Sequence, residues 1–187
     1  MRVIAGTAKG TRLGAVPAGV RPVSDMAREG LFASLGGHVE GARWLDLFAG
    51  TGAVGIEALS RGASEAVFVE RSRAALALIR ANLERTRLAG RATVIGAEVG
   101  RFLQGGRRDA EPFDIASLDP PYELGDPALS GYLAAIDAGW LAPEGWTVVL
   151  TRGHKGPWPA LPVHWAAGRQ LRYGDSLLTL YREERWA

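Results

Sequence analysis

Short apolar runs alternate with amphipathic segments along most of the chain. The segments at residues 24–35, 56–59, 72–88 and 126–140 have helical spacing. The apolar runs predict five buried strands, at residues 44–48, 66–70, 93–95, 113–118 and 146–150. Strands that alternate with helices are typical of an α/β fold with a parallel sheet. Near the end, residues 169–173 and 177–181 flank Gly174-Asp175 and predict an antiparallel hairpin.

The first 22 residues predict a basic β-hairpin arm, and residues 23–187 predict a single domain. Residues 2–6 are expected to form a short strand, Lys9-Gly10-Thr11 a turn, and Arg12-Leu13 the returning strand. The cations of this stretch, which has no acidic residue, are Arg2, Lys9, Arg12 and Arg21. Such an arm suits a phosphate backbone, although a solvated edge hairpin explains the same pattern.

The helix after the arm begins at Ser24 or Asp25, either of which can cap it. Its expected apolar face consists of Met26, Leu31, Phe32 and Leu35, and Gly36-Gly37 ends it. Arg28 and Glu29 lie in its first turns. There they can reach a ligand above the sheet, or serve as ordinary surface charges.

A glycine-rich loop connects the first predicted strand to the next helix, within Leu45–Ala63. Gly50, Gly52 and Gly55 follow the strand at the G-x-G-x-x-G spacing of nucleotide-binding loops. Asp46 lies inside the strand, where a carboxylate would repel a pyrophosphate but accept hydrogen bonds from a cationic or amino-bearing ligand. A dinucleotide site and a glycine turn that serves only packing remain alternatives at this point.

Two further acidic residues follow predicted strands. Glu70 ends the second strand, 20 residues beyond Gly50, at the spacing where an acidic residue accepts the hydroxyls of a ribose. Glu98 follows the third strand and suits either an adenine amino group or the N-terminus of a helix. The glycine loop and Glu70 together favour a nucleoside ligand.

The fourth predicted strand ends in Asp119-Pro120-Pro121-Tyr122. The two prolines fix the backbone and remove two amide donors. The Asp119 carboxylate and the Pro120 carbonyl remain as rigid acceptors beside an aromatic ring. This arrangement suits a planar ligand with an exocyclic amino group, whose N–H bonds the acceptors hold while the ring stacks.

Composition adds few constraints. The 187 residues suit one domain, and 22 basic against 20 acidic residues give a net charge of only +2. Two of the 22 cations are lysines, so 20 are arginines; this bias suits nucleic acid and equally a GC-rich genome. The absence of cysteine excludes disulfides and thiolate metal sites, and no metal is expected. With no signal peptide or transmembrane run, we expect a cytoplasmic monomer without membrane contact.

These motifs together resemble a known family. Asp-Pro-Pro-Tyr behind an Asp-Leu-Phe-Ala-Gly-Thr-Gly loop resembles the S-adenosylmethionine-dependent amino-group methyltransferases. With the segments of residues 21–25 and 28–32 and the sequence LDLFAGTGAVGIEALSRGA, the chain resembles the bacterial family that methylates N2 of one guanine in 16S ribosomal RNA. The resemblance extends from Arg2 to Tyr181. It departs at Val23, where threonine is usual, and at Glu98, where asparagine or aspartate is commoner.

The resemblance implies a Rossmann-like class I methyltransferase fold with a seven-stranded, mostly parallel sheet, a C-terminal antiparallel hairpin and an N-terminal β-hairpin arm. It implies S-adenosylmethionine as cofactor and 16S rRNA, or the assembling small ribosomal subunit, as partner. The implied catalytic residues are Asp119, Pro120, Pro121 and Tyr122, and the implied RNA contacts are Arg2, Lys9, Arg12, Arg21 and Arg28. The implied cofactor contacts are Asp46, Phe48, Gly50, Thr51, Gly52, Glu70, Arg71, Glu98, Val99 and Asp119.

Three other functions fit the motifs less well. An adenine-N6 methyltransferase of DNA or RNA would use the same Asp-Pro-Pro-Tyr sequence, but the basic arm and the lack of a separate DNA-recognition domain disfavour it. A non-catalytic RNA-binding module is disfavoured by the intact Asp119–Tyr122 motif. A dehydrogenase is disfavoured by Asp46.

Overall fold

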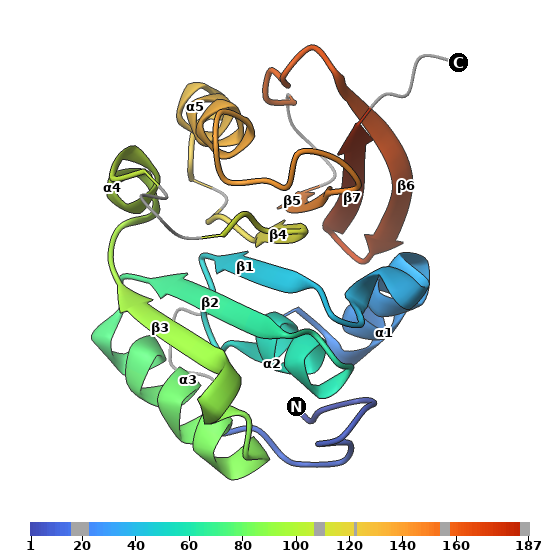
Figure 1. The fold of residues 1–187 in the computed structure, drawn as a ribbon, viewed down its shortest axis with the longest axis vertical. Coiled ribbons are helices and arrows are strands. Elements are labelled where there is room, and N and C mark those ends of the chain that lie inside the picture. Colours follow the sequence, from blue (N-terminus) through green and yellow to red (C-terminus); the bar gives the residue numbers. More distant parts are fainter. Residues whose placement is uncertain (16–22, 107–110, 122, 154–157, 184–187) are drawn as a thin grey trace.

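A computed structural model describes residues 1–15, 23–106, 111–121, 123–153 and 158–183. Its centre is one seven-stranded sheet with the order β3-β2-β1-β4-β5-β7-β6 (Figure 1). The strands are β1 (Arg43–Leu47), β2 (Glu65–Glu70), β3 (Ala92–Gly96), β4 (Ile115–Leu118), β5 (Thr147–Gly153), β6 (Trp165–Tyr173) and β7 (Ser176–Glu183). The α-helices are α1 (Asp25–Leu35), α2 (Ala53–Ser60), α3 (Arg73–Thr86), α4 (Val99–Gln104) and α5 (Asp126–Asp137). Two short 3₁₀ helices cover Gly36–Val39 and Ala89–Arg91.

The first five strands are parallel, and the hairpin of β6 and β7 completes the sheet. β7 pairs antiparallel with both β5 and β6, with Val149 opposite Leu180 and Leu171 opposite Leu178. The predicted mostly parallel sheet with a terminal hairpin is confirmed. The apolar runs form its central strands because these strands are buried on both faces.

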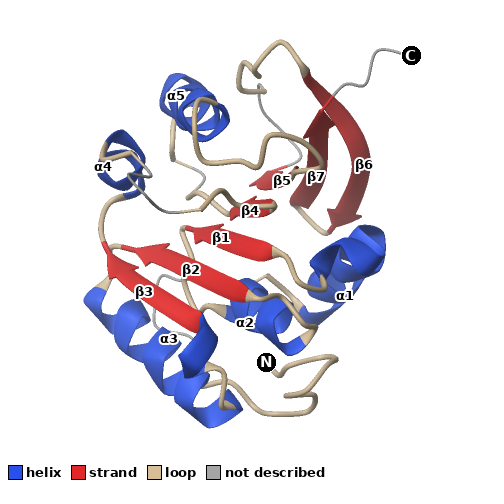
Figure 2. Ribbon diagram, in the orientation of Figure 1, coloured by secondary structure: helices blue, strands red, loops and turns tan. Residues whose placement is uncertain are grey.

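Helices cover both faces of the sheet (Figure 2). Alternate residues of β1 divide between the two layers: Trp44 packs with α1, α2 and α3, and Leu45 packs with α4 and α5. The first layer includes Phe32, which stacks on Trp44 with ring centroids 5.5 Å apart. The helices cover the faces of the sheet and leave the carboxyl ends of the parallel strands available for a site.

The N-terminal segment, residues 1–15, differs from the predicted hairpin. Arg2 and Arg12 form an isolated antiparallel bridge, so the expected strand over residues 2–6 is limited to one paired residue. The reason is that the Glu57 side chain of α2 accepts the amides of Ile4 and Ala5, at 2.8 and 3.0 Å. The segment therefore lies against α2, and its Val3, Ala8 and Leu13 side chains are buried.

Helix α1 begins as predicted but exposes one residue that we expected to be buried. The Ser24 hydroxyl accepts the Ala27 amide and caps the helix. Leu31, Phe32 and Leu35 are buried as predicted, whereas Met26 is 69% exposed. Met26 lies off the stripe that these residues form with Ala27, so the prediction that it faces the core is wrong.

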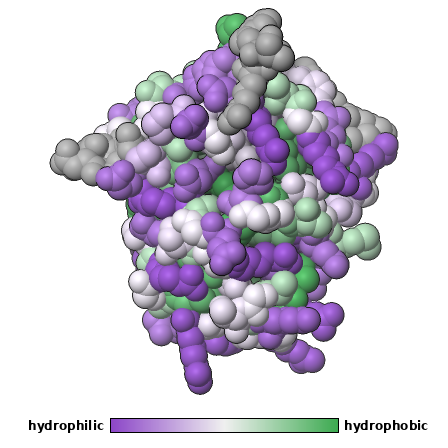
Figure 3. All heavy atoms as spheres, turned by 45° about the vertical axis from the view of Figure 1, so that its right-hand side comes forward, coloured by the Kyte–Doolittle hydropathy of each residue, from purple (hydrophilic) through white to green (hydrophobic). Residues whose placement is uncertain are grey.

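The surface seen in Figure 3 is mostly hydrophilic, with apolar residues in scattered spots. Among the described residues, the large apolar side chains that are exposed are Met26, Trp158 and Val163. In the same part of the chain, no helix has the length and apolar character needed to cross a membrane.

Candidate active site

A cavity of about 700 Å³ lies at the carboxyl ends of the parallel strands. This volume is within the usual range for small-molecule sites. Segments that follow β1, β2, β3 and β4 all contribute to it, because the carboxyl ends of parallel strands meet at one edge of the sheet. The predicted residues among its lining are Asp46, Phe48, Gly50, Thr51, Glu70, Arg71, Glu98, Val99, Asp119, Pro120 and Pro121.

The glycine loop connects the cavity to the start of α2. Gly50 and Gly52 have φ angles of 55° and 74°, a region that disfavours other residues. Phe48 adopts a φ of 59° without being glycine and lines the cavity. Gly52 does not line the cavity; an added Cβ there would lie 3.1 Å from Ile79, so this glycine serves the turn and the packing of α2 on α3.

Asp46 is the buried acid at the floor of the cavity. Its Oδ2 accepts the Gly55 amide at 3.1 Å, and its Oδ1 accepts the Ser117 hydroxyl at 2.8 Å. Burial raises the pKa of Asp46 to about 7, although both hydrogen bonds oppose the rise. The carboxylate thus titrates near neutral pH in a cavity that suits a cationic group.

Glu70 is held at the end of β2 by three backbone amides. Its Oε2 accepts Gly50 at 3.0 Å, and its Oε1 accepts Arg71 and Ser72 at 2.8 Å each. A carboxylate has about four acceptor positions, so one remains for a ligand hydroxyl. The same contacts fix the glycine loop relative to β2.

Glu98 lines the cavity and also caps α4. Its two oxygens accept the amides of Gly100 and Arg101 at 2.9 Å each, and these bonds hold the pKa of Glu98 below its usual value. Oε1 also accepts the hydroxyl of Tyr132 at 3.0 Å. Of the two roles that the sequence left open for Glu98, its contacts in the structure are those of a residue at the N-terminus of a helix.

The Asp119-Pro120-Pro121 segment, called the acceptor motif below, follows β4 and also borders the cavity. Asp119 is partly exposed, Pro120 is buried and Pro121 is exposed, and all three line the cavity. Tyr122 lies outside the described residues. The loop beyond is fixed by Arg152 of β5, which donates to the Leu124 carbonyl at 3.2 Å and to Asp126 at 2.8 Å.

Comparison with known proteins decides which family these features belong to. The family described as Conserved hypothetical protein 95 matches residues 1–182. The chain belongs to this family. Ribosomal RNA small subunit methyltransferase D of Escherichia coli K12 is 36% identical, over 98% of this chain and 90% of its own length. A Bacillus subtilis protein named "Putative rRNA methyltransferase YlbH" is 33% identical, over 98% of this chain and 99% of its own. A solved structure titled "Putative methyltransferase yhhF from Escherichia coli" has a TM-score of 0.85 at 34% identity, over 98% of both chains.

Family membership agrees with the resemblance inferred from the sequence, and the Rossmann-like class I fold is confirmed.

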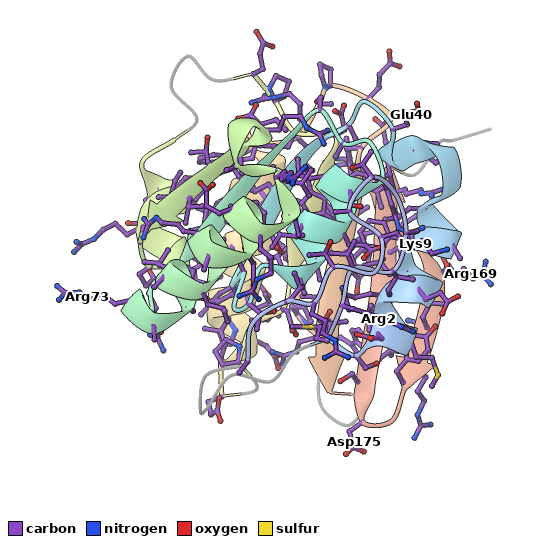
Figure 4. All side chains as sticks on the ribbon, turned by 90° about the horizontal axis from the view of Figure 1, so that it is seen from below. Arg2, Lys9, Glu40, Arg73, Arg169 and Asp175 are labelled. Carbon is purple, nitrogen blue, oxygen red and sulfur yellow. The ribbon has the colours of Figure 1, made fainter. Side chains whose placement is uncertain are left out.

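The residues that the resemblance implied as RNA contacts differ in their exposure in the structure. Arg2, Lys9 and Arg12 are at least partly exposed on the N-terminal segment. In Figure 4, Arg2 and Lys9 lie on the side of α1 and the N-terminal segment, and Arg73 points away on the opposite side. Arg21 lies outside the described residues.

Arg28 is not exposed, as a residue that contacts RNA would have to be. Its side chain is 0% exposed. It donates to the Arg2 carbonyl at 2.8 Å and to Asp25 at 2.6 Å, and it lies 3.6 Å from the equally buried Glu57. The prediction that Arg28 contacts RNA is contradicted by this burial: the residue joins α1, α2 and the N-terminal segment.

Sequence reasoning missed the part of the cavity wall built from α5 and the terminal hairpin. Tyr132 of α5 lines it and has ring contact with Phe48, at 6.1 Å between centroids. Tyr173, Ser176 and Leu178 of the terminal hairpin line it as well. These residues stand in ordinary amphipathic patterns without a motif, so no local signal in the sequence could have found them.

Proposed function

We propose that this protein transfers a methyl group from S-adenosylmethionine to the exocyclic amino group (N2) of a guanine in 16S ribosomal RNA. The observation that carries the proposal is the meeting of Asp46, Glu70 and Asp119-Pro120-Pro121 around one cavity. A relative with 36% identity named ribosomal RNA small subunit methyltransferase D supports the same substrate.

The side chains that line the cavity suit the chemical groups of the cofactor. The amino group of a methionine moiety is cationic and would bind at Asp46, in the glycine loop with Phe48, Gly50 and Thr51. The remaining acceptor position of Glu70 suits a ribose hydroxyl, and Val99 beside Glu98 suits the adenine. When bound, S-adenosylmethionine supplies an electrophilic methyl group on a sulfonium sulfur.

The acceptor motif accounts for the choice of an amino group. The lone pair of a guanine amino group is delocalised into the ring, so this nitrogen is a poor nucleophile. Acceptance of its two N–H bonds by the Asp119 carboxylate and the Pro120 carbonyl favours a more tetrahedral nitrogen. Asp119, or water, then takes the proton that is lost. Positioning is therefore the main catalytic contribution of these residues, with Tyr122 as the stacking partner.

RNA binding is assigned to Arg2, Lys9 and Arg12, together with Arg21. Cations on a segment that packs against α2 can hold phosphates while a base enters the cavity. A target base must leave its stack, which costs a few kcal/mol that contacts inside the pocket offset. The N-terminal segment is well fixed for this task, because Asn82 of α3 accepts its Gly14 amide at 2.8 Å and donates to the Thr51 carbonyl of the glycine loop at 3.2 Å.

The test is a transfer of labelled methyl groups from S-adenosylmethionine to small subunits from a strain that lacks this activity. Naked 16S RNA is assayed in parallel, and the digested nucleosides are identified. We expect label in N2-methylguanosine at one position, and its loss with Asp119→Ala while the variant still binds RNA. Label in methyladenosine would make the protein an adenine amino methyltransferase. Cofactor binding without transfer to any RNA or DNA would make it a non-catalytic module.

A further inference from the structure

Three buried side chains form a chain of hydrogen bonds beneath the cavity. Trp44 and Asp46 are two residues apart on β1 and therefore lie on the same face of the sheet. Ser117 of β4 is opposite Asp46 in the strand register. The Trp44 indole N–H donates to the Ser117 oxygen at 2.8 Å, and the Ser117 hydroxyl donates to Asp46 Oδ1 at 2.8 Å.

The direction of this chain is fixed by chemistry. An indole N–H can only donate, so the Ser117 oxygen accepts there and its own hydrogen must be donated elsewhere. The Leu45 carbonyl, at 3.5 Å, is a poor alternative to Asp46 Oδ1. Because the Gly55 amide of α2 donates to Oδ2, both carboxylate oxygens face donors. This arrangement stabilises the ionised form of Asp46.

The surroundings act in the opposite direction. Asp46 is buried, and the charged groups that face it are Asp119 at the end of β4 and Glu70 at the end of β2, both acidic. Burial and these two charges raise its pKa to about 7, against the hydrogen bonds of Ser117 and Gly55. The protonation of this carboxyl at neutral pH is therefore set by a balance in which Ser117 takes part.

We infer that Ser117 and Trp44 are positioning residues that act through Asp46. They keep its carboxylate ionised at the cavity floor, where it receives the cationic amino group of the cofactor. The inference rests on the proposed function, since the cation in question belongs to S-adenosylmethionine. It assigns a role to two residues that belong to neither the glycine loop nor the acceptor motif.

The first measurement needs no cofactor. In the ¹³C-labelled protein, the titration of the Asp46 carboxyl is followed by NMR. We expect Ser117→Ala to move the midpoint upward by about one pH unit, the value of one hydrogen bond to an ionised group. Trp44→Phe should give a smaller rise, because the hydroxyl remains but loses the donor that orients it. Ser117→Thr, which keeps the hydroxyl, should restore the midpoint.

A matched control is Ser60→Ala. Ser60 is a buried serine of α2 whose hydroxyl bonds Ala5 and Ala8 of the N-terminal segment. The exchange therefore removes a buried hydroxyl on the same side of the sheet without touching Asp46. Its Asp46 midpoint should equal that of the wild type.

The second measurement is the binding of S-adenosylhomocysteine by calorimetry. This ligand retains the cationic amino group of the cofactor. The pH is varied between 5.5 and 8.5, a range of about 1.5 units on each side of the expected midpoint. Affinity should rise with pH through the Asp46 midpoint, and at pH 7 Ser117→Ala should bind about fivefold more weakly because a smaller fraction of Asp46 is ionised.

The outcomes separate the two proposals. An Asp46 midpoint that is unmoved in both Ser117→Ala and Trp44→Phe overturns the inference. A midpoint that moves while the pH dependence of binding stays the same shows a purely structural network and also overturns it. If the wild type binds no S-adenosylhomocysteine at any pH, the cofactor assignment of the proposed function fails, whatever the NMR titration shows.

Discussion

Replacement of Asp46 by asparagine should change how the stability of the fold depends on pH. The carboxyl ionises near 3.8 in an unfolded chain and near 7 in the folded protein. Between these values the folded state keeps a proton that the unfolded state has lost, so the free energy of unfolding falls as pH rises. Above pH 7 both states are ionised and this contribution stays constant. The asparagine side chain does not titrate, so the variant lacks this decline.

The magnitude follows from the pKa difference. One pH unit within this window is worth about 1.4 kcal/mol, so from pH 5 to pH 8 the wild type loses roughly 3 kcal/mol more than the variant. Asparagine also turns its NH₂ group toward either Ser117 or Gly55, both donors, at a cost of about 1–3 kcal/mol that does not depend on pH. The comparison therefore uses the pH dependence and not the absolute stability.

Urea unfolding of both proteins at pH 5, 6, 7 and 8 provides the assay, and the other titrating groups cancel in the difference. We expect the free energy of unfolding of the variant to rise relative to that of the wild type with each step up to pH 7. Above pH 7 the difference between the two should stay constant. A stability difference that is equal at pH 5 and pH 8 would refute the reasoning, because it would mean that Asp46 titrates alike in both states.

Three further predictions concern other contacts. Arg28→Met should lower the free energy of unfolding by about 1.5–3 kcal/mol in urea titrations at pH 7, because it removes the hydrogen bonds to the Arg2 carbonyl and Asp25, while Arg61 still pairs with Glu57 at 2.7 Å; a loss below about 0.5 kcal/mol would contradict this account. Arg152→Met should lower kcat about tenfold by loosening the loop after Pro121, while the Kd of S-adenosylhomocysteine stays unchanged; an equal loss of both would show general damage instead. Exchange of Arg2, Lys9 and Arg12 of the N-terminal segment for glutamine should reduce the slope of log affinity for RNA against log salt by about 2 to 3, and an unchanged slope would place the RNA elsewhere.

The sequence predicted those features that depend on local pattern. The five parallel strands follow from their apolar runs, and the glycine loop from its spacing. Glu70 and Asp119 share the cavity because each ends a parallel strand, so their register in the sheet brings them together. The placement of these two acids at one cavity could thus be predicted from the sequence.

Features that depend on long-range packing could not be predicted. Arg28 looks like a surface cation, and only the approach of Glu57 from α2 and of the Arg2 carbonyl makes it a buried one. The amides of residues 4 and 5 can pair with a strand, yet they bond the Glu57 carboxylate. Tyr132 and the hairpin residues reach the cavity through the placement of α5 and the β6–β7 hairpin on the sheet, which no local motif encodes.

The position of β7 inside the sheet has a consequence for the order of folding. This strand is synthesised after the other six, yet it lies between β5 and β6 and its Ser176 and Leu178 line the cavity. Domains emerge from the ribosome N-terminus first, and pairings between distant segments form late. A nascent chain that already carries the glycine loop and Asp119-Pro120-Pro121 therefore still lacks one wall of its site. The wall of the cavity is therefore complete only when synthesis has passed β7.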